Sequence, residues 1–467
     1  MSQELKHKPT RAVAAAVQLP NVSDAELQAS LTELRQLAKT LGFEVVATFT
    51  QQRPKFDSAA YLGVGKRQEM RRFVRNELEP DRTGDTPSAD EEAEAKEAAE
   101  TRADPDTRRA DIILVDHEIS PMQARNLEKA VGIEVMDRTM VILEIFHRHA
   151  RSRAARAQVE IVRLSYMAPR LREAAKLAGP QGRQRSGVGG RGAGESRGEL
   201  DRRKIRERIA ELQKELVAID SERKTQRERR QEREGLARVA LVGYTNAGKS
   251  TLMRALTGSE VLVADKLFAT LDTTVRALHP ESVPRVLVSD TVGFIENLPH
   301  GLVASFKSTL DEALEASLLL HVIDAADPGF ERQRAVTEEV LDEIGAQAVP
   351  RILVFNKIDR IGDEAAQRDR EAALRAQHPD CIVMSARRAA DIAKLHAAIA
   401  AFFRRHLVEA ELLVPWSAQQ LRGEIFQHCE VLEEHAENEG AFFRVRAKPE
   451  ILKRLREQLC VGLTRDE

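Results

Sequence analysis

The chain has 467 residues and a formal net charge of -2, and its length exceeds what one hydrophobic core organises, so two to four domains are expected. With 42% hydrophobic and 31% charged residues it has the composition of a soluble protein, and no window approaches the ~18 uninterrupted apolar residues that an integral membrane protein needs. The three cysteines, Cys381, Cys429 and Cys460, are far apart and lack metal-ligand spacing, so they suggest neither a disulfide framework nor a zinc site and favour a cytoplasmic protein with reduced thiols.

Apolar runs alternate with an amphipathic stretch over the first 152 residues, which predicts a small α/β domain. In chain order the predicted elements are a strand over 11–19, a helix over 24–41, a strand over 43–50, a strand over 110–115, and a helix from Ser120 through Glu128 with Pro121 in its first turn. The domain is predicted to span residues 1–152.

An acidic segment interrupts this domain. From Glu77 to Asp106, acidic residues outnumber basic ones twelve to three, and Pro80, Pro87 and Pro105 are interspersed among few apolar residues. Such a segment cannot bury enough surface to offset the entropy of ordering it. We therefore predict a disordered acidic insertion over about residues 77–108.

Helical patterns dominate residues 153–234. Ile205, Ile209, Leu212, Leu216 and Ile219 follow the heptad spacing of a coiled-coil seam, and Val159, Val162 and Tyr166 form an apolar edge on an earlier helix. We predict an antiparallel helical hairpin. Its tip is predicted over 179–198, where glycines alternate with arginines that can contact phosphate. A flexible linker is the alternative for this tip.

Positive charge is concentrated in the same region. From Arg148 to Ile209 there are seventeen Lys and Arg against six Asp and Glu. This excess indicates a polyanionic partner such as RNA, although a solvated helix face is an equally good explanation of the charge alone.

Residues 235–406 alternate apolar runs with helix-length polar segments, the rhythm of a doubly wound, mostly parallel sheet. The predicted strands span residues 237–242, 285–290, 318–324, 352–356 and 382–385. Residues 407–467 are predicted to form a small α+β domain, with a strand at 412–414, a helix near 417–434, a strand at 441–447 and a helix from Pro449.

Residues 243–250 match the phosphate-loop pattern G-x-x-x-x-G-K-[ST], directly after a predicted strand and before a helix-forming segment. The loop amides and the helix N-terminus suit a phosphate. Lys249 is predicted to bridge the β- and γ-phosphates, and the Ser250 hydroxyl to ligate Mg²⁺. The residues of this loop predicted to bind nucleotide are Gly243, Tyr244, Thr245, Asn246, Ala247, Gly248, Lys249, Ser250 and Thr251.

A second motif, D-x-x-G, closes the next predicted strand. The carboxylate of Asp290 can hold Mg²⁺ through water, and the amide of Gly293 can sense a γ-phosphate. Between the two motifs we favour Thr270 as the second magnesium ligand, with Thr273 and Thr274 as alternatives. Lys249, Thr270 and Gly293 are the predicted catalytic residues.

A third motif, N-K-x-D, begins at Asn356 and predicts a guanine pocket. Asp359 can accept hydrogen bonds from the ring N–H and the exocyclic amine of guanine, whereas adenine lacks that amine. Asn356 and Lys357 belong to the same motif, and Ser385 and Ala386 would complete the pocket through backbone contacts. Together the motifs predict a GTP-binding, GTP-hydrolysing domain.

One position departs from many GTPases. Phe294 follows Gly293 where a glutamine commonly orients the attacking water, so intrinsic hydrolysis is expected to be slow. The loop sequence resembles that of potassium-activated GTPases, in which an asparagine at the position of Asn246 coordinates K⁺. We therefore hypothesise that K⁺ supplies the missing stabilisation.

With these motifs identified, the chain resembles the HflX family of ribosome-associated P-loop GTPases over nearly its whole length. The resemblance covers the signature SPMQARNLEKAVGIEVMDRTMVILEIF from Ser120, the switch-like segments FATLDTT and DTVGFI, and the glycine-rich Arg191–Glu195 followed by Asp201–Arg203. It implies a P-loop GTPase domain with a doubly wound sheet, preceded by a small α/β domain and an antiparallel helical hairpin and followed by a small α+β domain.

The resemblance also implies a function. A member of this family would bind the large ribosomal subunit (50S) and its RNA, place the glycine-rich loop near the peptidyl-transferase centre, and split stalled or idle ribosomes into subunits. We expect a cytoplasmic monomer that uses GTP and Mg²⁺. Two alternatives stay open: a nucleotide-gated ribosome- or RNA-binding module with little hydrolysis, and a broader NTPase that remodels RNA.

Overall fold

The computed structural model describes residues 9–76, 109–177, 197–234, 237–258, 267–268, 270–271, 273–282, 285–296, 312–405 and 407–463. The acidic segment 77–108 and all but the last two residues of the glycine-rich tip lie outside these ranges. The chain divides into two compact units, the first up to Ile219 with Leu267 and Phe268, and the second with the other described residues from Asp220 onward. Each unit is described by itself.

The first unit contains a four-stranded, fully parallel sheet in the order β2-β1-β3-β4. Its elements are β1 (Thr10–Gln18), α1 (Asp24–Leu41), β2 (Phe43–Gln52), α2 (Val64–Arg75), β3 (Ile112–Val115), α4 (Pro121–Val131), β4 (Glu134–Asp137) and α5 (Arg138–His149). The three predicted strands and both predicted helices are confirmed. By contrast, α2, β4 and α5 are not among the predicted elements.

Helix boundaries in this unit follow from local capping. The Ser23 side chain accepts a hydrogen bond from the Glu26 amide, and the Glu26 carboxylate accepts one from the Ser23 amide. Ser120 and Gln123 form the same capping box at the start of α4. Gly42 ends α1 with a φ of 82°, a left-handed conformation that glycine adopts without strain.

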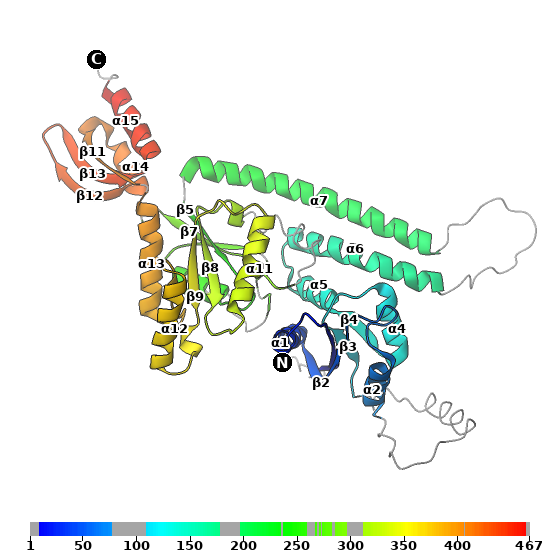
Figure 1. Ribbon diagram of the computed structural model, residues 1–467. Helices are drawn as coiled ribbons and strands as arrows, with labels where there is room; N and C mark the ends of the chain where they lie inside the picture. Colours follow the sequence, from blue (N-terminus) through cyan, green and yellow to red (C-terminus); the bar gives the residue numbers. More distant parts are fainter. Residues whose placement is uncertain are drawn as a thin grey trace, which may run out of the picture. The chain divides into compact units, whose positions relative to one another are not determined.

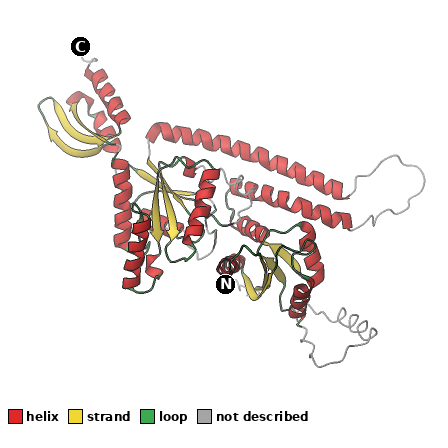
Figure 2. Cartoon of the chain, viewed as in Figure 1, coloured by secondary structure: helices red, strands yellow, loops and turns green. Residues whose placement is uncertain are grey.

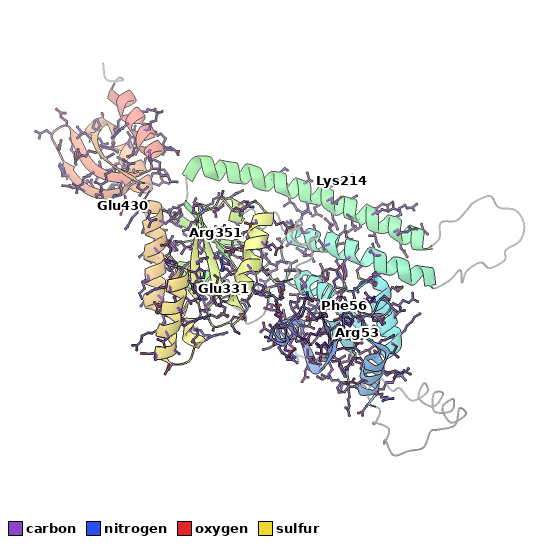
Figure 3. All side chains as sticks on the ribbon, viewed as in Figure 1. Arg53, Phe56, Lys214, Glu331, Arg351 and Glu430 are labelled. Atoms are coloured by element: carbon purple, nitrogen blue, oxygen red, sulfur yellow. The ribbon has the colours of Figure 1, made fainter. Side chains whose placement is uncertain are left out.

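Two long helices form the hairpin, α6 (Arg153–Leu177) and α7 (Arg197–Glu234), which lie side by side in Figure 1. Arg153 pairs with Glu215 at 2.9 Å, and Arg208 pairs with Glu160 at 2.9 Å. Going along α6 from Arg153 to Glu160, the paired residue on α7 moves back from Glu215 to Arg208, so the two helices are antiparallel. The predicted seam positions 205, 209, 212, 216 and 219 are partly or fully buried, whereas Lys214 between them is exposed (Figure 3).

The carboxylate of Asp137, which is fully buried at the end of β4, joins α6 to the sheet. It accepts hydrogen bonds from the Met140 amide at 2.9 Å, from Arg170 at 2.6 Å and from the Tyr166 hydroxyl. Burial, with the nearby Asp137 charge, raises the pKa of Tyr166, so the hydroxyl stays a donor. Tyr166, predicted as part of an apolar edge, therefore also makes a polar contact with the sheet.

The second unit contains a six-stranded sheet in the order β10-β9-β8-β5-β7-β6. All of its strands are parallel except β6, which is antiparallel to β7. Its strands and long helices are β5 (Ala237–Val242), α8 (Lys249–Thr257), β6 (Thr274–Ala277), β7 (Val286–Asp290), β8 (Leu318–Asp324), α11 (Phe330–Glu343), β9 (Arg351–Asn356), α12 (Glu364–Gln377), β10 (Ile382–Val383) and α13 (Ala389–Arg404).

Buried side chains lie on both faces of this sheet, as expected of a doubly wound fold. One cluster includes Val239, Leu241 and Leu320, and another, formed by alternate strand positions, includes Ile323 and Phe355. The predicted fold class is confirmed, with the edge strand β6 as an addition.

The C-terminal residues form a three-stranded antiparallel sheet with helices (Figure 2). Its elements are β11 (Val408–Pro415), α14 (Gln420–His428), β12 (Glu430–Ala436), β13 (Gly440–Ala447) and α15 (Pro449–Leu463). The single helix predicted near 417–434 is wrong, because α14 ends at His428 and the next residues pair with β13.

Within the described ranges, no helix combines the length and apolar character required to cross a membrane.

Candidate nucleotide-binding site

The loop between β5 and α8 has a backbone that requires its two motif glycines. Gly243 has a φ of 144°, and a Cβ there would lie 2.2 Å from the carbonyl oxygen of Val322. Gly248 has a φ of 99°, and a Cβ there would lie 2.3 Å from Nδ2 of Asn356. Asn246 adopts a left-handed φ of 58° between them. Larger residues at either glycine would displace the loop from β8 or from Asn356.

Lys249 lies at the first position of α8 and is folded under this loop. Its side chain is buried, and its Nζ donates hydrogen bonds to the carbonyl oxygens of Gly243 at 3.0 Å and Tyr244 at 2.7 Å. Burial lowers the pKa of Lys249 to about 8, and the Asp290 carboxylate partly opposes this effect. The amine is thereby held at the centre of the loop, where a phosphate would meet it.

Three oxygen-bearing side chains meet at the ends of α8 and β7. The Ser250 hydroxyl donates to Oδ2 of Asp290 at 2.7 Å, and the Thr270 hydroxyl donates to the same oxygen at 2.9 Å. The two hydroxyl oxygens are 2.8 Å apart. Of the three candidate threonines, Thr270 is the one with contacts to Ser250 and Asp290, whereas Thr274 lies in β6 and pairs with the Asp290 backbone.

The second carboxylate oxygen of Asp290 is buried without a hydrogen-bond partner among the described residues. Burial raises the pKa of Asp290, and the Lys249 charge and the two hydroxyls oppose this shift. A hard divalent cation prefers oxygen ligands of this kind and keeps several waters. The donor set of Ser250, Thr270 and Asp290 therefore fits Mg²⁺.

Asn356 connects the phosphate loop to the loop after β10. Its Nδ2 donates to the Ala247 carbonyl at 3.0 Å, and its Oδ1 accepts from the Ala386 amide at 2.9 Å. Lys357 donates to the Asn246 carbonyl and, at 2.8 Å, to the Asp324 carboxylate. The third motif thus fixes the loop that precedes Lys249, beyond any role in recognising a base.

Asp359 and Ser385 follow the neighbouring strands β9 and β10. Asp359 lies in the short 3-10 helix Ile358–Arg360, with its carboxylate 3.8 Å from a guanidinium nitrogen of Arg387. Ser385 is fully buried, and its amide donates to the Asp391 carboxylate at 3.0 Å. The residues predicted for the base pocket are therefore brought to one edge of the sheet.

Several contributors to the site are not among the predicted residues. Asp324 holds Lys357, and Asp391 holds the backbone of Ser385. Asp324 is the last residue of a predicted strand, which is the signal that could have identified it, whereas Asp391 lies in the first turn of α13, six residues after the predicted strand 382–385. The remaining predicted residues of the loop are Thr245, which is buried, and Thr251, which lies in the first turn of α8.

Three family models match the chain. Residues 238–357 match one described as 50S ribosome-binding GTPase, residues 149–230 one described as GTP-binding GTPase Middle Region, and residues 28–81 and 92–147 one described as GTP-binding GTPase N-terminal. The last match is interrupted within the acidic segment.

Curated relatives match nearly all of the chain. A GTPase HflX from Gluconacetobacter diazotrophicus is 52% identical, covering 96% of this chain and 98% of that protein. A GTPase HflX from Caldanaerobacter subterraneus is 37% identical, covering 97% and 95% respectively. The chain belongs to the HflX family. A further HflX GTPase, from Escherichia coli, is 40% identical over 71% of this chain and 76% of that protein.

As an HflX GTPase, the chain binds GTP and hydrolyses it to GDP and phosphate. The residue after Gly293 is Phe294, which is 3% exposed and cannot orient a water molecule through its side chain. Instead, its backbone pairs with the phosphate loop: its amide donates to the Gly243 carbonyl at 3.1 Å, and its carbonyl accepts from the Thr245 amide at 2.7 Å. In this HflX protein the backbone of that segment, rather than a glutamine side chain, borders the phosphate loop.

Proposed function

We propose that this HflX GTPase binds the large ribosomal subunit and, in its GTP-bound state, separates stalled or idle ribosomes into subunits. The match of residues 238–357 to a 50S ribosome-binding GTPase carries the proposal. The positively charged segment from Arg148 to Ile209 supports it, because it places seventeen basic and six acidic residues largely on the hairpin. Binding to RNA phosphates would weaken steeply with salt.

In the proposed site, residues 243–251 hold the phosphates, and Ser250, Thr270 and Asp290 hold Mg²⁺, the last through water. Bound Mg²⁺ would offset the charge that develops on the phosphates during hydrolysis. Lys249 bridges the β- and γ-phosphates, and the Gly293 amide contacts the γ-phosphate. Asn356, Lys357, Asp359, Ser385 and Ala386 form the guanine pocket.

GTP turnover measured with isolated large subunits tests the proposal. Because Phe294 leaves intrinsic hydrolysis slow, docking is expected to accelerate turnover at least roughly tenfold. Small subunits serve as the control, and sedimentation of 70S ribosomes with a non-hydrolysable GTP analogue reports splitting and the stoichiometry expected of a monomer. Binding without stimulation would instead favour the nucleotide-gated module, the alternative that Phe294 motivates.

Potassium is the proposed source of the stabilisation that Phe294 cannot supply. Asn246 lies at the exposed turn of the phosphate loop, where its carbonyl already accepts a hydrogen bond from Lys357. Basal turnover is expected to be at least about fivefold faster in K⁺ than in Na⁺ buffer, because an ordered cation stabilises developing charge. Asn246→Ala should remove the difference. Equal rates of the unchanged protein in the two buffers would refute a potassium site.

A further inference from the structure

The segment after Asp290 is held against the phosphate loop by more than its backbone. Phe294 and Tyr244 form a β-bridge, and two residues later the Glu296 amide donates to the Tyr244 hydroxyl at 2.9 Å. Tyr244 is 8% exposed, so this hydrogen bond is largely shielded from water. The phosphate loop thus contacts the segment after Asp290 at two points, through the backbones of Gly243 and Thr245 and through the phenol of Tyr244.

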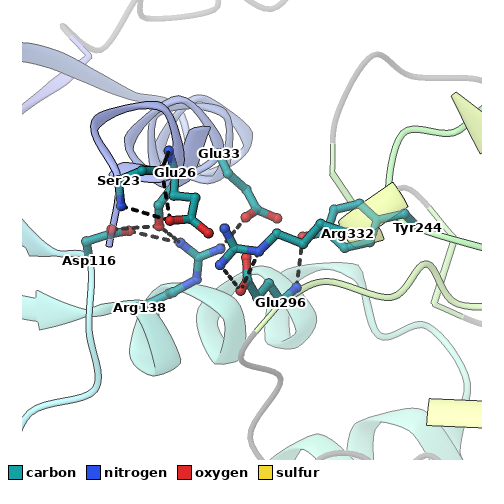
Figure 4. Close-up of polar contacts among 9 residues, drawn as sticks. Ser23, Glu26, Glu33, Asp116, Arg138, Tyr244, Glu296 and Arg332 are labelled. Carbon is teal, nitrogen blue, oxygen red and sulfur yellow. Dashed lines mark hydrogen bonds and ion pairs between the residues drawn. The ribbon is translucent and has the colours of Figure 1, made fainter. Parts of the chain in front are cut away.

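An ion pair fixes the same segment from its other side. The Glu296 carboxylate contacts the guanidinium of Arg332, a residue of α11, with Nε at 3.1 Å (Figure 4). The Glu296 side chain is 24% exposed and that of Arg332 48%. Ion pairs this exposed contribute little to folding stability, so a substitution of Arg332 should leave the fold intact.

These contacts set the position of Gly293. A Cβ on Gly293 would lie 2.9 Å from Cα of Thr245 and 3.0 Å from Nζ of Lys249, so the glycine lies directly against the loop and its lysine. In the next three residues, the Phe294 amide donates a hydrogen bond to the Gly243 carbonyl and the Glu296 amide donates one to the Tyr244 hydroxyl. The bond between Glu296 and Tyr244 is therefore one of three hydrogen bonds that hold the backbone next to Gly293 against the phosphate loop.

We propose that Tyr244 and the Glu296–Arg332 ion pair act as positioning residues for GTP hydrolysis. They form a clamp that holds the backbone of Gly293 and Phe294 against the phosphate loop. Because Phe294 offers no side chain to orient water, the placement of this backbone determines the geometry of the transition state. The clamp acts on the hydrolysis step, and the affinity of the phosphate loop and the guanine pocket for the nucleotide does not depend on it.

Tyr244→Phe is the direct test, since it keeps the ring and removes the hydroxyl that accepts a hydrogen bond from the Glu296 amide. Loss of one shielded hydrogen bond that acts in the transition state should lower kcat roughly fivefold and leave KM within about twofold. Affinity for a fluorescent GTP analogue is measured on the same preparation. A raised KM with unchanged kcat would mean that Tyr244 only supports nucleotide binding, and would overturn the proposal.

The ion pair provides a second test that does not depend on the tyrosine. Arg332→Glu should lower basal kcat several-fold, and combining it with Glu296→Arg should restore most of the loss, because the exchanged charges pair again. Arg334→Ala is the matched control, since Arg334 lies on the same helix and pairs with Glu331 and Glu338 of that helix. Equal losses in the Arg332 and Arg334 variants, or no rescue by the exchange, would overturn the clamp. All rates are measured without ribosomes, so the outcome is independent of the proposed ribosomal function.

Discussion

Replacing Asp359 with asparagine is expected to lower GTP affinity by about a hundredfold or more and to create a preference for xanthosine triphosphate. When a site accepts two hydrogen bonds from a base, changing one of the partners lowers the affinity far more than removing an apolar contact does. The asparagine carbonyl can still accept from the ring N–H, but its NH₂ would face the exocyclic amine of guanine donor to donor, whereas xanthine offers a carbonyl oxygen in place of that amine. Competition between labelled nucleotides measures the change.

Asp363→Asn is the matched control for this substitution. Asp363 lies four residues further on, caps α12 by accepting a hydrogen bond from the Ala366 amide, and is exposed. Asparagine caps helices about as well as aspartate, so this variant should bind GTP like the unchanged protein. If Asp359→Asn likewise kept full GTP affinity, the guanine pocket would have to lie elsewhere.

The strands that position the site could be predicted because their sequence signals are local. β5 and β8 have the predicted bounds, and each is mostly apolar, interrupted by Arg238 in β5 and by His321 in β8. Parallel strands that are buried on both faces have such mostly apolar sequences. The phosphate loop and the guanine motif could therefore be assigned to strand ends. Among three nearby threonines with the same chemistry, the sequence favoured Thr270, and the structure adds its contacts with Ser250 and Asp290.

The elements that could not be predicted depend on contacts remote in sequence. Residues 430–436 read EVLEEHA, whose intrinsic preferences favour a helix, yet they form β12 because β13 offers a pairing edge across a short turn at Gly440. The bridge between Tyr244 and Phe294 joins residues fifty positions apart and relies on backbone groups that every residue carries. A pattern of residue types holds no signal for such a contact.

Arg138→Met is expected to destabilise the first unit by about 3–5 kcal/mol, because it leaves buried carboxylates without their cation. The side chains of Arg138 and Asp116 are each 2% exposed, with Nη1 of Arg138 2.9 Å from Oδ1 of Asp116. The other terminal nitrogen of Arg138 contacts Glu33, which is 14% exposed (Figure 4). The Ser30 hydroxyl also donates to Asp116, at 2.7 Å. Methionine fills the volume but pairs with neither acid.

Hydrogen exchange of the amides in β1 and β3 measures this loss within the first unit alone, which avoids treating a chain of two units as a single cooperative transition. Arg163→Met, which removes a 40% exposed partner of Glu144, should cost less than about 1 kcal/mol. Replacing Arg138, Asp116 and Glu33 together by apolar residues of similar size should recover much of the loss, because an apolar cluster leaves no buried charge unpaired. Protection in Arg138→Met equal to that of the unchanged chain would show that the buried ion pairs contribute nothing to the stability of this sheet.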